Sequence, residues 1–203
     1  MEMKEMIRSF PRQIKEQFDN LKDISTDKEI FKNIESIVIA GMGGSAISGD
    51  LIKVFLRDSL NIPVHVIRHY TLPSWCNKNT LFIICSYSGN TEETLSIYES
   101  AKKISKMLIS ISTGGELSKR SNIDKIKVLK LPNNFQPRAA LGYSIITLLV
   151  ILNKLDILNS KKLDITLKAS YELDNFYKNY CTKNSYAFKI AKKLQNSLIW
   201  IYG

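Results

Sequence analysis

The sequence predicts an α/β domain with a mainly parallel β-sheet, and two observations carry that prediction. Short β-branched or apolar runs alternate with helical patterns between residues 36 and 155. Such alternation is typical of a parallel sheet that is covered by helices on both faces. In addition, one glycine-rich and one Ser/Thr-rich segment each lie directly between a strand run and a helical pattern. Ligands bind at such loops, beyond the carboxyl ends of the strands, in open α/β sheets.

The leading helix is predicted over residues 3–21, where apolar side chains recur at helical spacing. Pro11 interrupts this stretch and predicts a boundary or a kink. Strands are expected at residues 36–40, 64–67, 80–85, 107–111 and 127–131. Helices are expected to follow at residues 46–57, 92–104, 116–121 and 138–155. The result is a repeated strand, loop and helix unit.

The last part of the chain predicts helices at residues 161–180 and 185–195 and a sixth strand at 197–202. A buried strand that only Gly203 follows would lack its crossover helix, so the chain is expected to be incomplete at its C-terminus. We therefore expect one domain at residues 1–157, with its leading helix. Residues 158–203 are expected to hold linking helices and the first strand of an incomplete second domain.

Composition excludes several classes of protein. The 203 residues are 44% hydrophobic and 24% charged, so the chain can bury a sizeable core. No apolar run reaches the roughly 18 to 20 residues that span a bilayer, and the N-terminus is charged; we expect a cytoplasmic protein without a membrane partner. Cys76, Cys85 and Cys181 form no Cys-x-x-Cys motif and are interpreted as packing thiols.

The net charge of +10 leaves two classes of partner open, nucleic acids and small anions. The lysines near the C-terminus lie at helical spacing among apolar residues, and there is no arginine-rich run. This pattern favours a solvated helix face over a nucleic-acid surface. A nucleic-acid partner is therefore not expected.

The first loop, Gly41-Met42-Gly43-Gly44-Ser45, allows a tight turn ahead of a helix N-terminus, where free N–H groups can bind an anion. A glycine turn with Ser45 as helix cap is an equally good interpretation of this loop alone. Gly41, Gly43 and Ala46 also match a dinucleotide fingerprint. That alternative needs an acidic residue after the second strand, where Arg68 and His69 stand instead.

The second loop places the hydroxyls of Ser86, Ser88 and Thr91 within six residues, with Gly89 and Asn90 between them. Hydroxyls at the start of a helix can hold a phosphate group without any charged side chain. The structural alternative is an ordinary Ser/Thr-rich turn that caps the helix. Two such loops at strand ends favour the phosphate site.

Together with Gln136-Pro137-Arg138, these two loops resemble the sugar isomerase (SIS) domain superfamily. Within it, the chain is most similar to the bifunctional phosphoglucose/phosphomannose isomerases, over essentially residues 1–203. The resemblance implies a five-stranded parallel sheet of flavodoxin-like type. It also implies interconversion of glucose 6-phosphate or mannose 6-phosphate with fructose 6-phosphate through an enediolate, with neither a cofactor nor a metal.

The resemblance also assigns roles to particular residues. The sugar phosphate would be held by the matched loop residues Gly44, Ser45, Ser86, Ser88 and Thr91. Arg138 would stabilise the enediolate, because a guanidinium keeps its charge at any relevant pH. The structural alternative is that Arg138, near the start of a helix, makes a surface ion pair.

The general base, the ring-opening histidine and the lysine of this family would lie beyond Gly203, and the complete protein would be a homodimer. His65 and His69 are no substitutes, since they stand about 13 Å apart on a strand. A SIS module that senses a sugar phosphate without catalysis remains the alternative function.

Overall fold

The computed structural model describes residues 2–180 and 182–200, and its centre is a five-stranded parallel sheet. The strands are β1 Ser36–Ala40, β2 Val64–Ile67, β3 Thr80–Cys85, β4 Leu108–Ser112 and β5 Lys127–Lys130. Their order is β2-β1-β3-β4-β5, which is the flavodoxin-like order. The expected parallel sheet is confirmed, with β4 displaced by one residue from the expected range and β5 one residue shorter.

The inner strands are buried on both faces, and this explains their continuous apolar sequence. Every residue of β1, β3 and β4 is buried. Val38 of β1 pairs with His65 of β2 on one side and Phe82 of β3 on the other. Residues at alternate positions face opposite helix layers: Ile37 and Ile39 belong to one buried cluster, and Val38 to the other.

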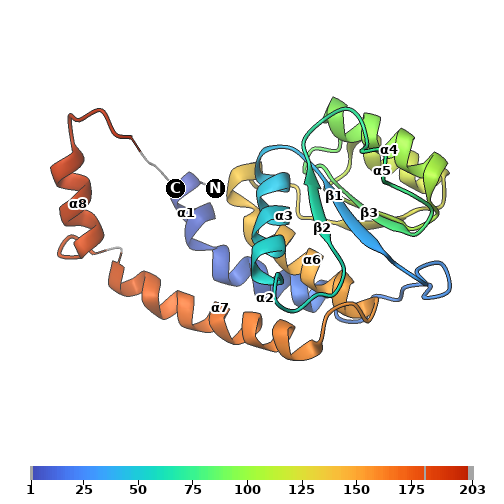
Figure 1. The fold of residues 1–203 in the computed structure, drawn as a ribbon. Coiled ribbons are helices and arrows are strands. Elements are labelled where there is room, and N and C mark those ends of the chain that lie inside the picture. Colours follow the sequence, from blue (N-terminus) through green and yellow to red (C-terminus); the bar gives the residue numbers. More distant parts are fainter. Residues whose placement is uncertain (1, 181, 201–203) are drawn as a thin grey trace.

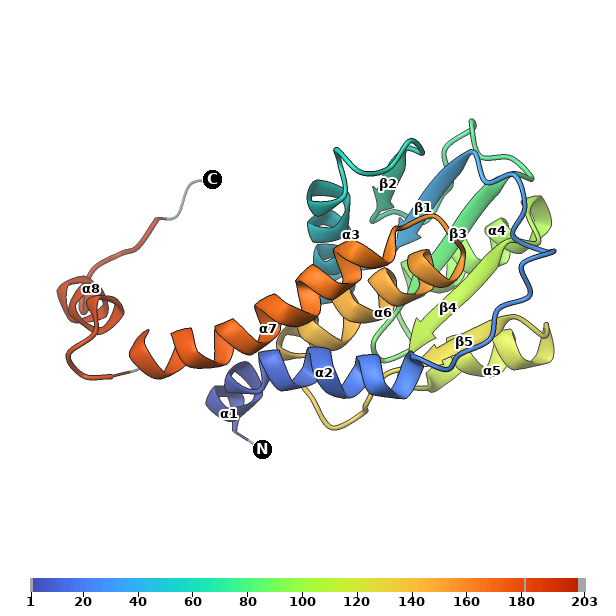
Figure 2. The same cartoon turned by 90° about the horizontal axis from the view of Figure 1, so that it is seen from below.

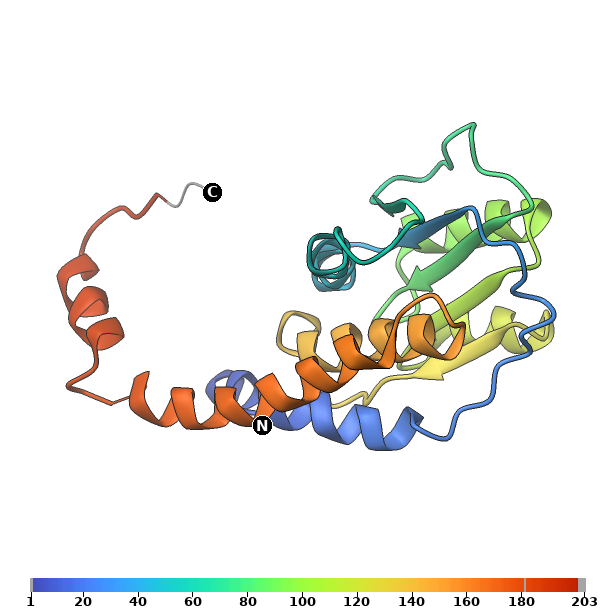
Figure 3. The ribbon, with the colours of Figure 1, turned by 60° about the horizontal axis from the view of Figure 1, so that its bottom comes forward.

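Two helix layers cover the sheet (Figures 1 and 3). Helices α4 (Glu92–Ile104) and α5 (Gly115–Ile123) pack on one face. The other face is covered by α2 (Phe10–Leu21), α3 (Gly43–Phe55) and α6 (Leu141–Lys154). The neighbouring strands β1 and β3 are followed by helices on opposite faces of the sheet, α3 on one face and α4 on the other. The loops that leave these two strands therefore turn away from each other. This divergence creates a crevice at their carboxyl ends.

The leading helix is broken, as Pro11 predicted. α1 (Met3–Arg8) ends at Ser9, and α2 then begins with Pro11 in its first turn, where a missing N–H costs no hydrogen bond. α2 packs against α6 through buried Ile14 and Leu21. α2 also buries two polar side chains, Gln13 and Gln17.

Two helix starts differ from the predicted ones. α3 begins at Gly43 rather than at residue 46, and the residue before it, Met42, provides no side-chain cap. The expectation that Ser45 caps this helix is therefore wrong, because Ser45 lies inside its first turn. The long helix expected from residue 138 begins as a 3-10 turn, η1 (Pro137–Ala139), and becomes α-helical only at Leu141. Ala140, with φ −100° and ψ 19°, separates the two.

The C-terminal helices are α7 (Ser160–Tyr180) and α8 (Tyr186–Leu194). α7 runs along α2 and α6, whereas α8 stands away from the sheet (Figure 2). The sixth strand expected at residues 197–202 is not formed at 198–200, which have no strand neighbour, and 201–202 lie outside the described residues. The division of the chain at residue 157 stays a prediction. Within the described ranges, no helix is both long and apolar enough to cross a membrane.

Candidate functional site

The two predicted loops meet at the crevice between β1 and β3. Gly41 directly follows β1, and Ser86 directly follows the neighbouring β3. The backbones are so close that a Cβ on Gly41 would lie 2.9 Å from the carbonyl oxygen of Cys85. Gly41 is therefore required for close packing of the two loops. Its neighbour Gly43 adopts a positive φ of 49°, a conformation that glycine adopts with little strain.

The second loop is held by its own hydroxyls. Ser86 Oγ lies 2.9 Å from Thr91 Oγ1 and accepts a hydrogen bond of 3.1 Å from the Gly89 N–H. Ser88 Oγ accepts a bond of 3.2 Å from the Asn90 N–H. Thr91 occupies the N-cap position of α4, yet its hydroxyl bonds no backbone N–H of the helix. If Ser86 donates to Thr91, the Thr91 proton remains available to an incoming phosphate.

A third glycine-containing segment supports this loop, and the sequence reasoning missed it. Gly115 has a φ of +67°, and a Cβ there would lie 2.3 Å from the Ser88 carbonyl oxygen. The Glu116 N–H, at the start of α5, donates to Asn90 Oδ1 over 2.9 Å. The Leu117 N–H donates to the Gly89 carbonyl over 2.8 Å. The adjacent glycines 114 and 115, which precede a helical pattern, are the sequence feature from which a third loop at this site could have been predicted.

Gln136-Pro137-Arg138 lies against the first loop. A Cβ on Gly44 would stand 3.0 Å from the Pro137 carbonyl oxygen and 3.5 Å from Arg138 Cα. Tyr87 links the second loop to the same segment, since its hydroxyl donates to the Pro132 carbonyl at 2.5 Å and accepts from the Phe135 N–H at 3.2 Å. Burial raises the pKa of Tyr87, so the phenol keeps its proton. The three signature segments, far apart in the sequence, therefore converge.

The leading helices hold the Arg138 segment from behind, which the sequence reasoning did not anticipate. The fully buried Gln13 donates to the Ala139 carbonyl over 2.8 Å and accepts from the Gly142 N–H over 3.1 Å. The Gln136 N–H contacts the Met6 sulfur at 3.4 Å. These contacts explain why the helix start is interrupted at Ala140: Gln13 takes backbone groups that a continuous helix would pair internally.

Arg138 itself is exposed, and it forms no ion pair among residues 2–180 and 182–200. The alternative of a surface ion pair is thus unsupported, and the guanidinium is available to an anion. Ser45 is half-buried in the first turn of α3. The free N–H groups at the starts of α3 and α4 add positive partial charge near both loops.

Other chemically capable residues fall outside this arrangement. His65 packs against Trp75, with ring centroids 4.4 Å apart and ring planes tilted by 45°. Arg68, where a dinucleotide enzyme would have its acid, pairs with Asp50. Burial raises the pKa of Cys85 to about 12, so its thiol stays protonated. Thr94 lies closer to the loops: its buried hydroxyl has no hydrogen-bond partner within the described residues, and it lies beside Gly41 in a space too small for a water molecule.

The chain has relatives among known proteins. The chain is 41% identical over 204 residues to the bifunctional phosphoglucose/phosphomannose isomerase of Caldicellulosiruptor bescii, covering 99% of the chain and 60% of that protein. It is 40% identical over 140 residues to the enzyme of the same name from Thermoplasma acidophilum, covering 68% of the chain and 43% of that enzyme. The chain thus spans about 60% or less of the length of these relatives.

A solved structure shares the fold. The C-terminal domain of glucosamine-fructose-6-phosphate aminotransferase from Francisella tularensis superimposes with a TM-score of 0.72 at 17% identity, over 96% of this chain and 59% of that one. The family model described as the SIS domain matches residues 30–145, which include both loops and Arg138. The chain therefore belongs to the SIS domain family.

Proposed function

We propose that this chain provides the sugar-phosphate site of an aldose–ketose isomerase that interconverts glucose 6-phosphate or mannose 6-phosphate with fructose 6-phosphate. One observation carries the proposal: the two loops and the Arg138 segment, separate in sequence, are in direct backbone contact at the carboxyl ends of β1 and β3. The relatives named phosphoglucose/phosphomannose isomerase support the same substrate class.

In this proposal, the hydroxyls of Ser86, Ser88 and Thr91 donate to the phosphate oxygens, and Ser86 and Thr91 give up their mutual hydrogen bond when the phosphate binds. Gly44 and Ser45 complete the site through the first turn of α3, whose N–H groups favour an anion. An uncharged cradle of this kind binds a phosphate through directed donors and two helix N-termini.

Arg138 acts on the sugar rather than on the phosphate. When a proton moves between C1 and C2, negative charge develops on the two oxygens of the enediolate. The exposed, unpaired guanidinium of Arg138 keeps its charge and can donate to these oxygens. Arg138 therefore supplies the electrostatic part of catalysis, and the base that moves the proton is assigned to no residue of this chain.

Calorimetry tests the proposal on the purified 203-residue chain. Fructose 6-phosphate and arabinonic acid 5-phosphate, whose carboxylate mimics the enediolate, should both bind, whereas fructose should not. Arg138→Ala should lower the affinity for arabinonic acid 5-phosphate about 10- to 100-fold, since a hydrogen bond to a charged group contributes about 1.5 to 3 kcal/mol. Arg57→Ala, which removes an exposed arginine elsewhere that is paired with Asp58, is the matched control and should change nothing.

Further outcomes decide between an isomerase, a sensing module and a dinucleotide enzyme. Binding without turnover in an assay for glucose 6-phosphate formation fits a site that lacks its base, and full turnover by this chain would contradict that assignment. Equal affinity of wild type and Arg138→Ala for the mimic would favour a sensing module, in which no enediolate forms. Preference for NAD over sugar phosphates would overturn the proposal.

A further inference from the structure

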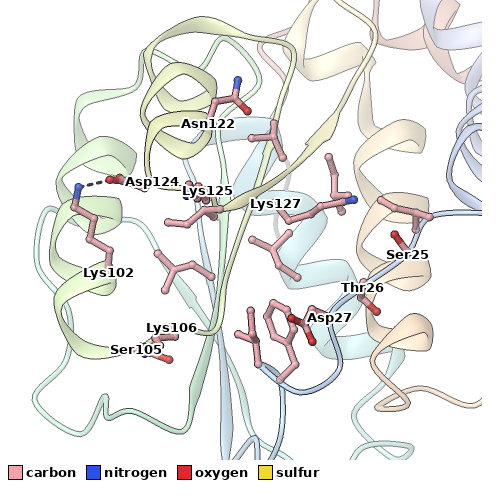
Figure 4. Close-up of a pocket in the computed structure, with 18 of the residues that line it drawn as sticks. Ser25, Thr26, Asp27, Lys102, Ser105, Lys106, Asn122, Asp124, Lys125 and Lys127 are labelled. Atoms are coloured by element: carbon pink, nitrogen blue, oxygen red, sulfur yellow. Dashed lines mark hydrogen bonds and ion pairs between the residues drawn. The ribbon is translucent and has the colours of Figure 1, made fainter.

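A separate hollow of about 1230 Å³ lies at the opposite end of the sheet from the two loops. It is formed by the start of β4, the whole of edge strand β5, the turns that precede these strands, and residues 21–31 from the end of α2 onward. Figure 4 shows its polar side chains, with Lys102 and Asp124 at one end and Ser25, Thr26 and Asp27 at the other. The phosphate loops follow the carboxyl ends of β1 and β3, so the hollow is a distinct site.

The floor of the hollow is apolar. Its accessible apolar side chains are Ile30, which is exposed, and Ile126 and Val128, which are half-buried. The core residues Leu108 and Leu129 lie buried beneath them. Phe31 and Ile24 pack against that core from the segment after α2. An apolar body placed here would be removed from water on its contact face, with a gain of roughly 25 cal/mol per Å² of apolar surface buried.

The rim, in contrast, is cationic. Its six lysines come from three parts of the chain: Lys102, Lys103, Lys106, Lys125, Lys127 and Lys130. Only Asp27 and Asp124 oppose them on the rim. Lys102 is paired with Asp124 at 2.9 Å and with Glu99 at 3.1 Å. The other five lysines form no ion pair within the described part of the chain. Uncompensated charges around a concave apolar surface focus a positive field into it.

We propose that this lysine hollow binds a small amphipathic organic anion. An aromatic or aliphatic body would lie on the floor, and a phosphate, carboxylate or sulfonate group would meet the unpaired lysines, principally Lys106 and Lys127. The combination of apolar floor and charged rim is typical of a small-molecule site in which few polar groups fix the orientation.

The geometry disfavours macromolecular occupants. β5 is an edge strand of only four residues, and Gln17 Nε2 already takes the Lys130 carbonyl at 3.0 Å. An added strand would therefore find little free backbone to pair with. The rim contains no arginine, and its apolar floor is concave, so it does not present the basic surface that follows a nucleic-acid backbone.

Fluorescence titration with 8-anilinonaphthalene-1-sulfonate on the full chain tests the proposal, with the neutral N-phenyl-1-naphthylamine as its counterpart without the sulfonate. Wild type should prefer the sulfonate. Lys106→Gln with Lys127→Gln should weaken sulfonate binding about tenfold or more and abolish the preference over the neutral dye. Lys161→Gln with Lys168→Gln on α7 removes the same charge elsewhere and should leave binding unchanged. Circular dichroism confirms that each variant is folded.

Three results would overturn the proposal. Equal losses in the two double variants would mean that only net charge matters. Loss of dye binding in Phe188→Ser, with retention in the hollow variant, would place the dye on the exposed apolar side chains of α8. Unchanged dye binding in a hollow variant that self-associates would mean that the lysines only protect an edge strand from pairing.

Discussion

The second loop leaves no room for a side chain at Gly89. Its φ is +75°, and a Cβ there would lie 1.9 Å from the Gly114 carbonyl oxygen. Gly89→Ala should therefore lower the free energy of unfolding by about 3 kcal/mol, from backbone strain and displacement of the neighbouring loop, and abolish fructose 6-phosphate binding. Urea unfolding and calorimetry measure the two effects.

Gly43→Ala is the matched control for Gly89→Ala. Gly43 also has a positive φ, +49°, but nothing lies within 4 Å of the position of its Cβ. Strain alone should cost about 1 kcal/mol. Equal stability of the two variants would show that packing against Gly114 is unimportant.

Ser86 and Ser88 should separate stability from binding. Ser86 is buried, and its hydroxyl bonds Thr91 and the Gly89 N–H, which also donates to the Ser86 carbonyl. Ser86→Ala therefore removes hydrogen bonds within the loop and should lower the free energy of unfolding by about 0.5 to 1.5 kcal/mol. Ser88 is exposed, and Ser88→Ala should leave the urea midpoint nearly unchanged. Both variants should lower the affinity for fructose 6-phosphate at least tenfold, as measured by calorimetry. A Ser88→Ala variant that binds normally would remove this residue from the proposed site.

Residue chemistry could be predicted from the sequence where neighbours in the chain determine it. The hydroxyls of Ser86 and Thr91 are five positions apart and do meet. The cap assigned to Ser45 was wrong, because the glycines allow the helix to start earlier. The roles of Gln13 and Gly115 depend on contacts with distant segments, and no local pattern contains that information.

Among the elements, α2 fixes the Arg138 segment through Gln13, which lies 126 and 129 residues away from its two partners. Gln13→Leu should leave the Ala139 carbonyl and the Gly142 N–H buried and unpaired, at a cost of about 2 to 4 kcal/mol. It should also weaken arabinonic acid 5-phosphate binding. Gln17→Leu is the matched control, because Gln17 is equally buried but bonds Lys130 and Thr147. It should lower the free energy of unfolding without lowering the affinity for arabinonic acid 5-phosphate. Equal binding by both variants would contradict a positioning role for Gln13.

α4 and α5 are joined by an ion network that should make stability depend on pH. The Tyr98 hydroxyl donates to Asp124 over 2.6 Å, and Lys102 donates over 2.9 Å; these bonds lower the pKa of Asp124 below its ordinary value of 3.8. A lowered folded-state pKa means that this stabilisation is present above pH 3.8 and is lost as pH falls through the folded-state pKa.

The stability difference between wild type and Tyr98→Phe should therefore be constant near neutral pH. It should shrink only below about pH 4, in urea titrations across pH 2 to 7. A difference that grows as the pH falls would contradict the assignment of Asp124 as the acceptor.

Element boundaries followed from the sequence where burial determines them. β1, β2 and β3 begin and end at the expected residues, because their apolar runs are flanked by turn residues. The 3-10 turn before α6 could not be predicted, since its cause is the side chain of Gln13 on another helix.

At the scale of the whole molecule, the chain has a core and an appendage. β3 is buried throughout, whereas α8 has no buried residue. Hydrogen exchange followed by mass spectrometry should show amides of residues 186–194 exchanging orders of magnitude faster than those of 80–85, because few contacts oppose local opening. Comparable protection of α8 and β3 would show that α8 is packed in solution.

The parallel sheet and its two helix layers were predictable because alternating strands and helices admit few topologies, whereas the flavodoxin-like strand order was implied by the resemblance. The site's position at the carboxyl ends of β1 and β3 follows from that order. The lysine hollow was not predictable, since it brings together residues 21–31 with the start of β4 and the whole of β5, which are distant in the sequence.

The most direct measurement of the central claim is a crystal structure of the chain with fructose 6-phosphate. The phosphate should lie within hydrogen-bond distance of the hydroxyls of Ser86, Ser88 and Thr91, with C1 and C2 of the sugar directed toward Arg138. A phosphate bound instead among the lysines of the hollow, with the two loops empty, would contradict the central claim.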